Sequence, residues 1–336
     1  MENINIRHLY IIGNGFDMTH GYETSYDNFR KYLISRFQIS EENYALVPES
    51  YTLPDGGEEY DEKEMAGFIA RILDECGDEN WGNLEDYLGS SVIDSLISEL
   101  DLLDKDDDSE KDLRHGFYNN EDRSEHMKNV FPRVKDYFCD WIMDYYRGLP
   151  YDKDGKLSDG SSRWKQGIAT ILKEGDGFLT FNYTMTLERL YGIDENNICH
   201  IHGKVGDKNE DIFFGHGEDD GVKESFEIMG AESNLSFLKY SLYKDTAKAW
   251  SRHADFFDRI GTDLIDIHSF GFSFSGVDFY YVQRLAEKVD ATKVTWYINQ
   301  HADLERRNGT INGRYLAAQL KKVEDLGFEV VVDGRW

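Results

Sequence analysis

The stretch "LYIIGNGFDMTHG", residues 9–21, begins as a short apolar run and breaks into a glycine turn. An apolar run of this length that ends at glycine is typical of a buried strand. A strand followed by a turn such as Gly13-Asn14-Gly15 is also a usual place for a backbone to approach a phosphate. A helix is predicted next, in "SYDNFRKYLISRF" (25–37). The first question is therefore whether this turn binds a nucleotide.

The composition restricts the kinds of partner. The chain has 336 residues, of which 40% are hydrophobic, so it is long enough to bury a large core. Its formal net charge of −28 repels a phosphate backbone, and we expect no binding of duplex DNA or RNA. A small nucleotide is still compatible with that charge, because backbone amides bind phosphate without a net positive charge.

The sequence also carries expectations about location. No apolar run approaches the roughly 20 residues that span a bilayer, and the first residues lack the features of a signal peptide. Three widely spaced cysteines without a CxxC pair indicate free thiols in a reducing compartment. We therefore expect a cytoplasmic protein that does not enter a membrane. The oligomeric state, including a homo-oligomer, stays open.

Short strands alternate with helices in the second half of the chain. Such alternation predicts an α/β fold with a mostly parallel, Rossmann-like sheet. We expect residues 1–40 and 166–336 to form this core, and residues 41–165 to form a large, mainly helical insertion that contains the acidic run 99–112. The candidate strands after the first are residues 177–183, 198–203, 211–215, 263–272, 293–299 and 328–333.

Several strand ends carry residues that suggest chemistry. Ligands of open parallel sheets lie at the carboxyl ends of the strands. The dinucleotide fingerprint would require a third glycine where Met18 stands, which argues against an ordinary dehydrogenase. His200 and His202, two apart on a predicted strand, would point to the same face, and with His216 they form an alternative metal site.

A second alternative is a serine hydrolase. Residues 271–275, "GFSFS", nearly match the GxSxG nucleophile elbow, with Ser273 as nucleophile. Ser275 replaces the final glycine, and a sharp elbow tolerates a side chain there poorly.

The motifs together resemble the bacteriophage abortive infection AbiH family. The resemblance rests on the first turn and on "WGNLEDYLG" (81–89), "FNYTMTLERLY" (181–191), "CHIHGKV" (199–205), "FFGHG" (213–217) and the segment ending "GVDFYY" (276–281). AbiH proteins in turn resemble sirtuin-like domains that bind or hydrolyse NAD.

That resemblance implies a role in antiviral defence and a set of site residues. His202 is expected to act as general base, and Asn182 to hold a water or the ribose. Asp17 is expected to accept from a ribose hydroxyl, or alternatively to cap a helix, and Glu85 is a weaker candidate. The residues expected to contact NAD are Gly13, Asn14, Gly15, Phe16, Asp17, Gly271 and Ser273.

One position departs from the family pattern, and two other functions remain open. The last turn usually reads Gly-His-Ser, whereas here Phe272 replaces the histidine, so this position has no catalytic role. A non-catalytic nucleotide sensor would need the same glycines. A phage-derived or defence-system protein is the expected trigger in either case.

Overall fold

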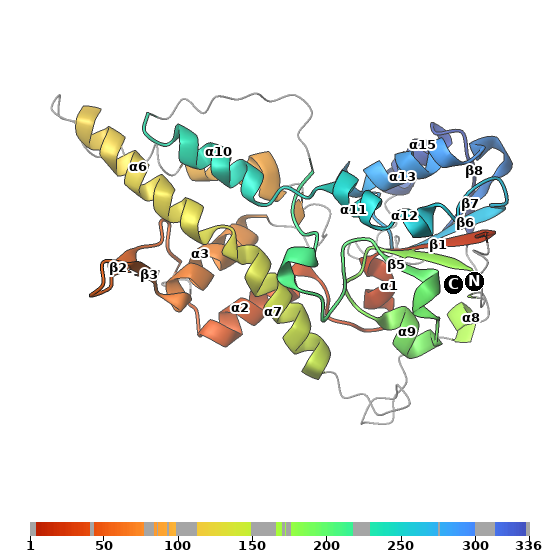
Figure 1. Ribbon diagram of the computed structural model, residues 1–336, viewed down its shortest axis with the longest axis horizontal. Helices are drawn as coiled ribbons and strands as arrows, with labels where there is room; N and C mark the ends of the chain where they lie inside the picture. Colours follow the sequence, from red (N-terminus) through yellow and green to blue (C-terminus); the bar gives the residue numbers. More distant parts are fainter. Residues whose placement is uncertain are drawn as a thin grey trace. The chain divides into compact units, whose positions relative to one another are not determined.

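The computed structural model describes residues 5–40, 44–76, 84–85, 87–92, 94–98, 113–148, 166–169, 172, 176–217, 229–274, 276–299 and 313–333. Its main feature is a six-stranded parallel sheet (Figure 1). This confirms the predicted α/β, Rossmann-like fold. The acidic run 99–112 lies outside the described residues. The sheet's strands, in chain order, are β1 (His8–Ile12), β4 (Gly177–Thr180), β5 (Ile198–His200), β6 (Asp266–Phe270), β7 (Thr295–Asn299) and β8 (Glu329–Asp333).

The first strand lies inside the sheet, as predicted. The spatial order is β5-β4-β1-β6-β7-β8, and β1 pairs in parallel with both β4 and β6. Ile12, the last residue of β1, is level with Thr180 on one side and with Phe270 on the other. This is the order of a doubly wound fold, in which the winding direction reverses between β1 and β6. The glycine turn after β1 therefore lies at the switch point.

All but one of the predicted strands are present, and most are shorter than expected. The exception is 211–215, where a 3-10 turn (Asn209–Asp211) leads into an irregular segment. There the Phe213 amide donates to His202 O at 2.9 Å, and the Tyr183 hydroxyl donates to Phe213 O at 2.9 Å. The apolar segment is therefore held by loops that follow β4 and β5, which explains its burial without a strand.

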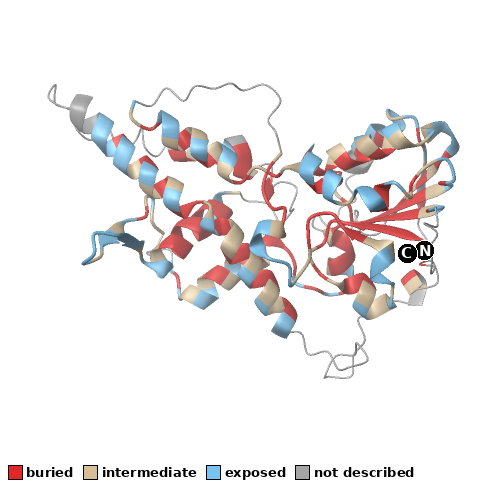
Figure 2. Ribbon diagram, in the orientation of Figure 1, coloured by how far each residue is buried: buried red, intermediate tan, exposed pale blue. Residues whose placement is uncertain are grey.

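Alternate residues of β1 enter two different cores. Leu9 and Ile11 pack with residues of the C-terminal helices, whereas Tyr10 and Ile12 pack with Leu187 of α9. The buried strands of the sheet are red in Figure 2. Among the described residues, no helix combines the length and apolar character needed to cross a membrane. The helices of this part are α1 (Asn14–Thr19), α8 (Gln166–Ala169), α9 (Thr186–Tyr191), α11 (Thr246–Arg252), α12 (Ala254–Phe257), α13 (Gly276–Lys288) and α15 (Gly313–Glu324).

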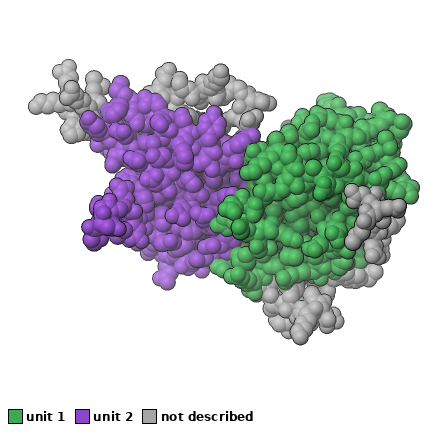
Figure 3. All heavy atoms as spheres, in the orientation of Figure 1, with its two compact units in different colours: residues 1–24, 142–213, 245–336 green, residues 25–141, 214–244 purple. Residues whose placement is uncertain are grey.

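The chain divides into two compact units (Figure 3). Unit 1 holds the sheet and comprises residues 1–24, 142–213 and 245–336, and unit 2 comprises residues 25–141 and 214–244. The expected core, residues 1–40 and 166–336, includes α2 and residues 214–244, which here belong to unit 2. The elements of unit 2 are α2 (Tyr26–Phe37), β2 (Ser50–Thr52), β3 (Glu58–Tyr60), α3 (Glu62–Glu75), a π-helical segment (Tyr87–Ser91), α6 (Leu113–Val130), most of α7 (Arg133–Gly148, which continues into unit 1) and α10 (Glu232–Ser241).

Candidate functional site

The turns that follow β1 and β6 are pressed against each other. The Gly13 amide donates to Phe270 O at 2.9 Å, and the Gly15 amide donates to Gly271 O at 3.0 Å. A Cβ on Gly13 would lie 2.4 Å from Gly271 O, and a Cβ on Gly271 would lie 2.3 Å from the Phe16 amide nitrogen. Gly271 also has a φ of +57°, a conformation that favours glycine. Contact between the two turns therefore accounts for both glycines.

This contact engages the amides that were expected to hold a phosphate. The Phe16 amide donates to Gly13 O at 2.9 Å, so Gly13, Gly15 and Phe16 all donate to carbonyl groups of the protein. A pyrophosphate binds such a turn through amides that point at the ligand. The residues at this turn therefore do not fit a pyrophosphate laid over Gly13–Gly15.

The neighbouring side chains of the first turn also have partners inside the protein. Asn14 donates to Thr24 O at 3.1 Å and accepts from the Thr24 hydroxyl at 2.7 Å. Phe16 is 2% exposed and belongs to the apolar core on the α9 side of the sheet. Both residues therefore stabilise the path of the chain after β1.

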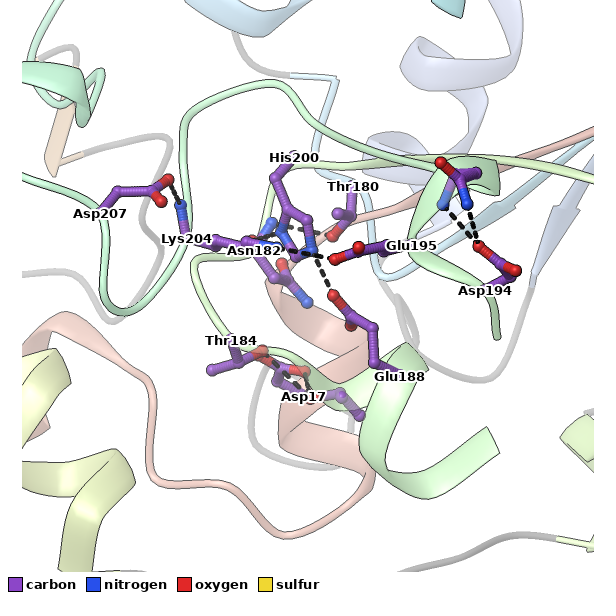
Figure 4. A network of polar contacts seen from close by, with 12 residues as sticks. Asp17, Thr180, Asn182, Thr184, Glu188, Asp194, Glu195, His200, Lys204 and Asp207 are labelled. Atoms are coloured by element: carbon purple, nitrogen blue, oxygen red, sulfur yellow. Dashed lines mark hydrogen bonds and ion pairs between the residues drawn. The ribbon is translucent and has the colours of Figure 1, made fainter. Parts of the chain in front are cut away.

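Asp17 is a buried carboxyl group inside α1. Its Oδ2 accepts from Thr184 Oγ1 at 2.5 Å, and its Oδ1 accepts from Thr186 Oγ1 at 2.7 Å. Burial raises the pKa of Asp17 to about 6, although hydrogen bonds from Thr184, Thr186 and Asn182 oppose that rise. Asp17 lies within the helix rather than at its cap, and it fastens α1 to the segment after β4 (Figure 4).

Asn182 connects the end of β4 to both neighbouring strands. Its side-chain Nδ2 donates to Gly13 O at 3.1 Å, and its own carbonyl oxygen lies 3.3 Å from His200 Nδ1. His200 Nε2 lies 2.9 Å from Glu188 Oε1 on α9 (Figure 4). Burial alone would raise the pKa of Glu188, but the hydrogen bond and charge of His200 outweigh it and lower that pKa. The strand ends of β1, β4 and β5 thus form one buried polar network.

His202 lies close to an acidic residue that the sequence analysis did not assign. Its Nε2 is 3.4 Å from Asp278 Oδ1, in the first turn of α13, and the histidine is 2% exposed. The rings of Phe181 and Tyr281 lie 5.2 and 5.7 Å from the His202 ring, centroid to centroid. A carboxylate beside an imidazole orients the ring and stabilises its protonated form, which suits a general base.

The two histidines of "CHIHG" point in different directions. Strand β5 ends at His200, so the period-two argument does not extend to His202. His200 faces Glu188 of α9, whereas His202 contacts α13 on the other core. His216 belongs to unit 2, where its ring nitrogens contact Gly217 O and Lys239 O. In the part of the chain that the structure describes, no three His, Cys, Asp or Glu side chains are grouped to hold a metal ion.

The turn after β6 is held by the last helix. Gln319 Nε2 donates to Ser273 O at 2.9 Å, and Lys322 Nζ donates to Phe274 O at 2.9 Å. Phe274 has a φ of +52°, unusual for an aromatic residue, whereas a nucleophile elbow would place its strain on Ser273. Phe272 packs on Phe181, with ring centroids 4.6 Å apart. Ser275 lies outside the described residues.

Glu85 lies in unit 2 and forms a buried ion pair there. Its Oε1 accepts from Lys244 Nζ at 2.6 Å, and the two side chains are 8% and 0% exposed. A buried lysine requires such a partner, so the pair has a structural explanation. Residues 81–83 and Asp86 of the same motif lie outside the described residues.

The structure thus brings most predicted site residues to one edge of the sheet. Asn182 bonds to Gly13, Gly13 contacts Gly271, and Phe272 reaches His202 through Phe181. Sequence reasoning missed Asp278, although an acid within the aromatic segment "GVDFYY" that follows a strand is a usable signal. It also missed the two threonines bound to Asp17, for which no local signal exists.

A comparison with protein-family models gave one match. The model described as "Bacteriophage abortive infection AbiH" matches residues 9–300, a range that includes both glycine turns and the strands β4 to β7. No curated protein and no solved structure matched the chain.

Proposed function

Because this chain belongs to the bacteriophage abortive infection AbiH family, we propose that it acts in anti-phage defence as an enzyme whose catalytic base is His202. The observation that carries the proposal is the Nε2–Asp278 Oδ1 distance of 3.4 Å. A buried histidine next to a carboxylate at a strand end has the arrangement of a base with its orienting group. The rings of Phe181 and Tyr281 lie beside His202, which is 2% exposed.

The proposed substrate is NAD or a related nucleotide, and the proposed reaction is hydrolysis of its nicotinamide–ribose bond. Support comes from the order of Gly13, Gly15, Asn182, His202 and Ser273 along the chain, which resembles sirtuin-like domains. Water would add its hydroxyl to C1′ as the C1′–N bond breaks, and nicotinamide would leave as the neutral base. His202 would take the remaining proton of the water, and Asp278 would stabilise the imidazolium.

The test consists of two assays, one on purified protein and one in phage-infected cells. Purified wild-type protein is incubated with NAD, and nicotinamide and ADP-ribose are separated by chromatography. We expect turnover that His202→Asn and Asp278→Asn reduce at least tenfold, since a positioned base contributes about 10²–10⁴-fold. In cells, where a phage-derived trigger is present, the same variants should lose protection against phage.

A second buried histidine provides the matched control. His20 is also 2% exposed, and its ring nitrogens contact Phe16 O and the Tyr191 hydroxyl rather than a carboxylate. His20→Asn should lower the melting temperature and reduce activity only in proportion to the unfolded fraction. If His202→Asn protein melts like His20→Asn and keeps its activity per folded molecule, the base assignment is wrong. Protection that persists in His202→Asn with nucleotide still bound would identify a sensor instead.

A further inference from the structure

Asn182 presents a buried acceptor at the edge of the sheet. The residue is 6% exposed, and its Nδ2 donates to Gly13 O and to the Asp17 carboxyl group. These two acceptors fix the orientation of the amide, because a flipped side chain would place its oxygen against both. Asn182 Oδ1 then has no hydrogen-bond partner among the residues that the structure describes. A buried acceptor without a partner is destabilising, and a donor on a ligand would offset that cost.

Two other buried oxygens near the strand ends are of the same kind. Gln319 is 2% exposed and donates its Nε2 to Ser273 O, while its Oε1 has no partner within the described ranges. Glu188 uses Oε1 for His200, and its Oε2 likewise has no described partner. Asn182 Oδ1, Gln319 Oε1 and Glu188 Oε2 are all hydrogen-bond acceptors.

Three backbone amides of the first turn and one ammonium group beside the second turn already donate to the protein. The amides of Gly13, Gly15 and Phe16 bind carbonyl groups of the protein, and the ammonium group of Lys322 donates to Phe274 O. No lysine or arginine side chain among the described residues bonds to Gly13, Gly15 or Asn182. An anionic phosphate would therefore meet acceptors and carboxyl groups where it needs donors.

We infer that this edge binds a neutral or cationic nucleoside moiety that donates a hydrogen bond to Asn182 Oδ1, and that it does not bind a diphosphate. The inference rests on the proposed function for its location and extends it to the part of the substrate that is recognised. For NAD, the nicotinamide riboside end supplies hydroxyl and carboxamide donors together with a positive ring. The diphosphate then makes no contact with the Gly13–Gly15 turn.

The test compares three probes on the purified protein by calorimetry at constant ionic strength: nicotinamide riboside, ADP and inorganic pyrophosphate. We expect nicotinamide riboside to bind, and ADP and pyrophosphate not to bind. Asn182→Leu should weaken riboside binding about tenfold or more, since one hydrogen bond of about 1.4 kcal/mol is a factor of ten. The inference is overturned if pyrophosphate or ADP binds as tightly as the riboside, or if no riboside binding is measured.

A second variant keeps the inference testable if Asn182→Leu does not fold. Gln319→Met keeps the side-chain length, removes the other unpartnered amide oxygen, and should also weaken riboside binding. Gln283→Met on the exposed face of α13 is the control and should leave binding unchanged. Wild-type affinity in both the Asn182 and Gln319 variants would contradict the inference.

The two proposals fail separately. Riboside binding without NAD turnover would leave this inference standing and refute the catalytic role of His202. NAD turnover that pyrophosphate or ADP inhibits competitively would support the proposed reaction and refute this inference.

Discussion

Gly13 would place a side chain against Gly271, and Gly271 would place one against Gly15 and Phe16 of the turn that Gly13 begins. A Cβ on Gly13 would lie 2.4 Å from Gly271 O, and a Cβ on Gly271 would lie 2.4 Å from Gly15 Cα. Both glycines also hydrogen-bond between the two turns, because the Gly13 amide donates to Phe270 O and Gly271 O accepts from the Gly15 amide. Glycine at a switch point usually makes room for a ligand. Here it makes room for another turn of the same protein.

Gly271→Ala should therefore lower stability by more than its backbone conformation alone explains. A left-handed alanine costs about 1–2 kcal/mol, and displacement of the facing backbone should bring the total to about 3 kcal/mol or more. Gly192 is the matched control, since it has a φ of +65° and no atom within 4 Å of a built Cβ. Urea unfolding of both variants measures the difference. Equal losses would show that the two turns are not in close contact.

The buried carboxyl group of Asp17 should make stability depend on pH. Its pKa rises from 3.8 to about 6 on folding, so the folded state keeps a proton that the unfolded state releases. Stability relative to Asp17→Asn should therefore fall as pH rises from about 4 to 6 and level off above. The full change is about 3 kcal/mol. Denaturant titrations at several pH values test this, and parallel curves for the two proteins would refute it.

The Glu188–His200 pair should show a measurable coupling energy. Its groups are 2.9 Å apart and mostly buried, so the coupling in a cycle of Glu188→Gln, His200→Gln and the double variant should be about 1–3 kcal/mol. The lowered pKa of Glu188 means that its stabilisation is present above about pH 4.5 and is lost as pH falls through the lowered value. Additive single-variant losses at pH 7 would argue against the pair.

In unit 2, we expect loss of Lys244 alone to destabilise the protein more than loss of both Lys244 and Glu85. Lys244→Met removes the ammonium group that lies 2.6 Å from the buried Glu85 carboxylate and should cost about 3–5 kcal/mol. Glu85→Met combined with Lys244→Met should recover most of that loss, because apolar replacement of both partners removes the buried charge. Thermal melting of the wild type, Lys244→Met and the double variant measures these losses. A double variant less stable than Lys244→Met would contradict it.

Local sequence patterns were sufficient to predict the strands of the sheet. Strand β1 could be predicted because apolar residues end at a glycine turn, and β4 to β8 because each short apolar run is bounded by turns or helices. The segment 211–215 was misassigned because its apolar residues look like a strand, whereas its partners are Tyr183 and His202 in loops. The pattern of apolar residues indicates which residues are buried, but it does not indicate which part of the backbone forms hydrogen bonds with them.

The candidate site was only partly accessible from sequence. Asn182, His202 and the glycines could be found because they follow strands that must end at one edge. The direction of each side chain could not be found in this way. His202 departs from its expected face because β5 ends two residues before it, and the use of the Gly13 and Gly15 amides depends on a turn more than 250 residues away.

The position of β1 between β4 and β6 also affects synthesis of the protein. The strand "HLYII" leaves the ribosome early, but its first neighbour ends at Thr180 and its second at Phe270. At 5–20 residues per second, the nascent chain carries this apolar strand without its partners for on the order of ten seconds to a minute. An unpaired apolar strand is an aggregation hazard, so chaperone binding during translation is expected. Any activity that depends on the edge of the sheet begins only after β6 has been made.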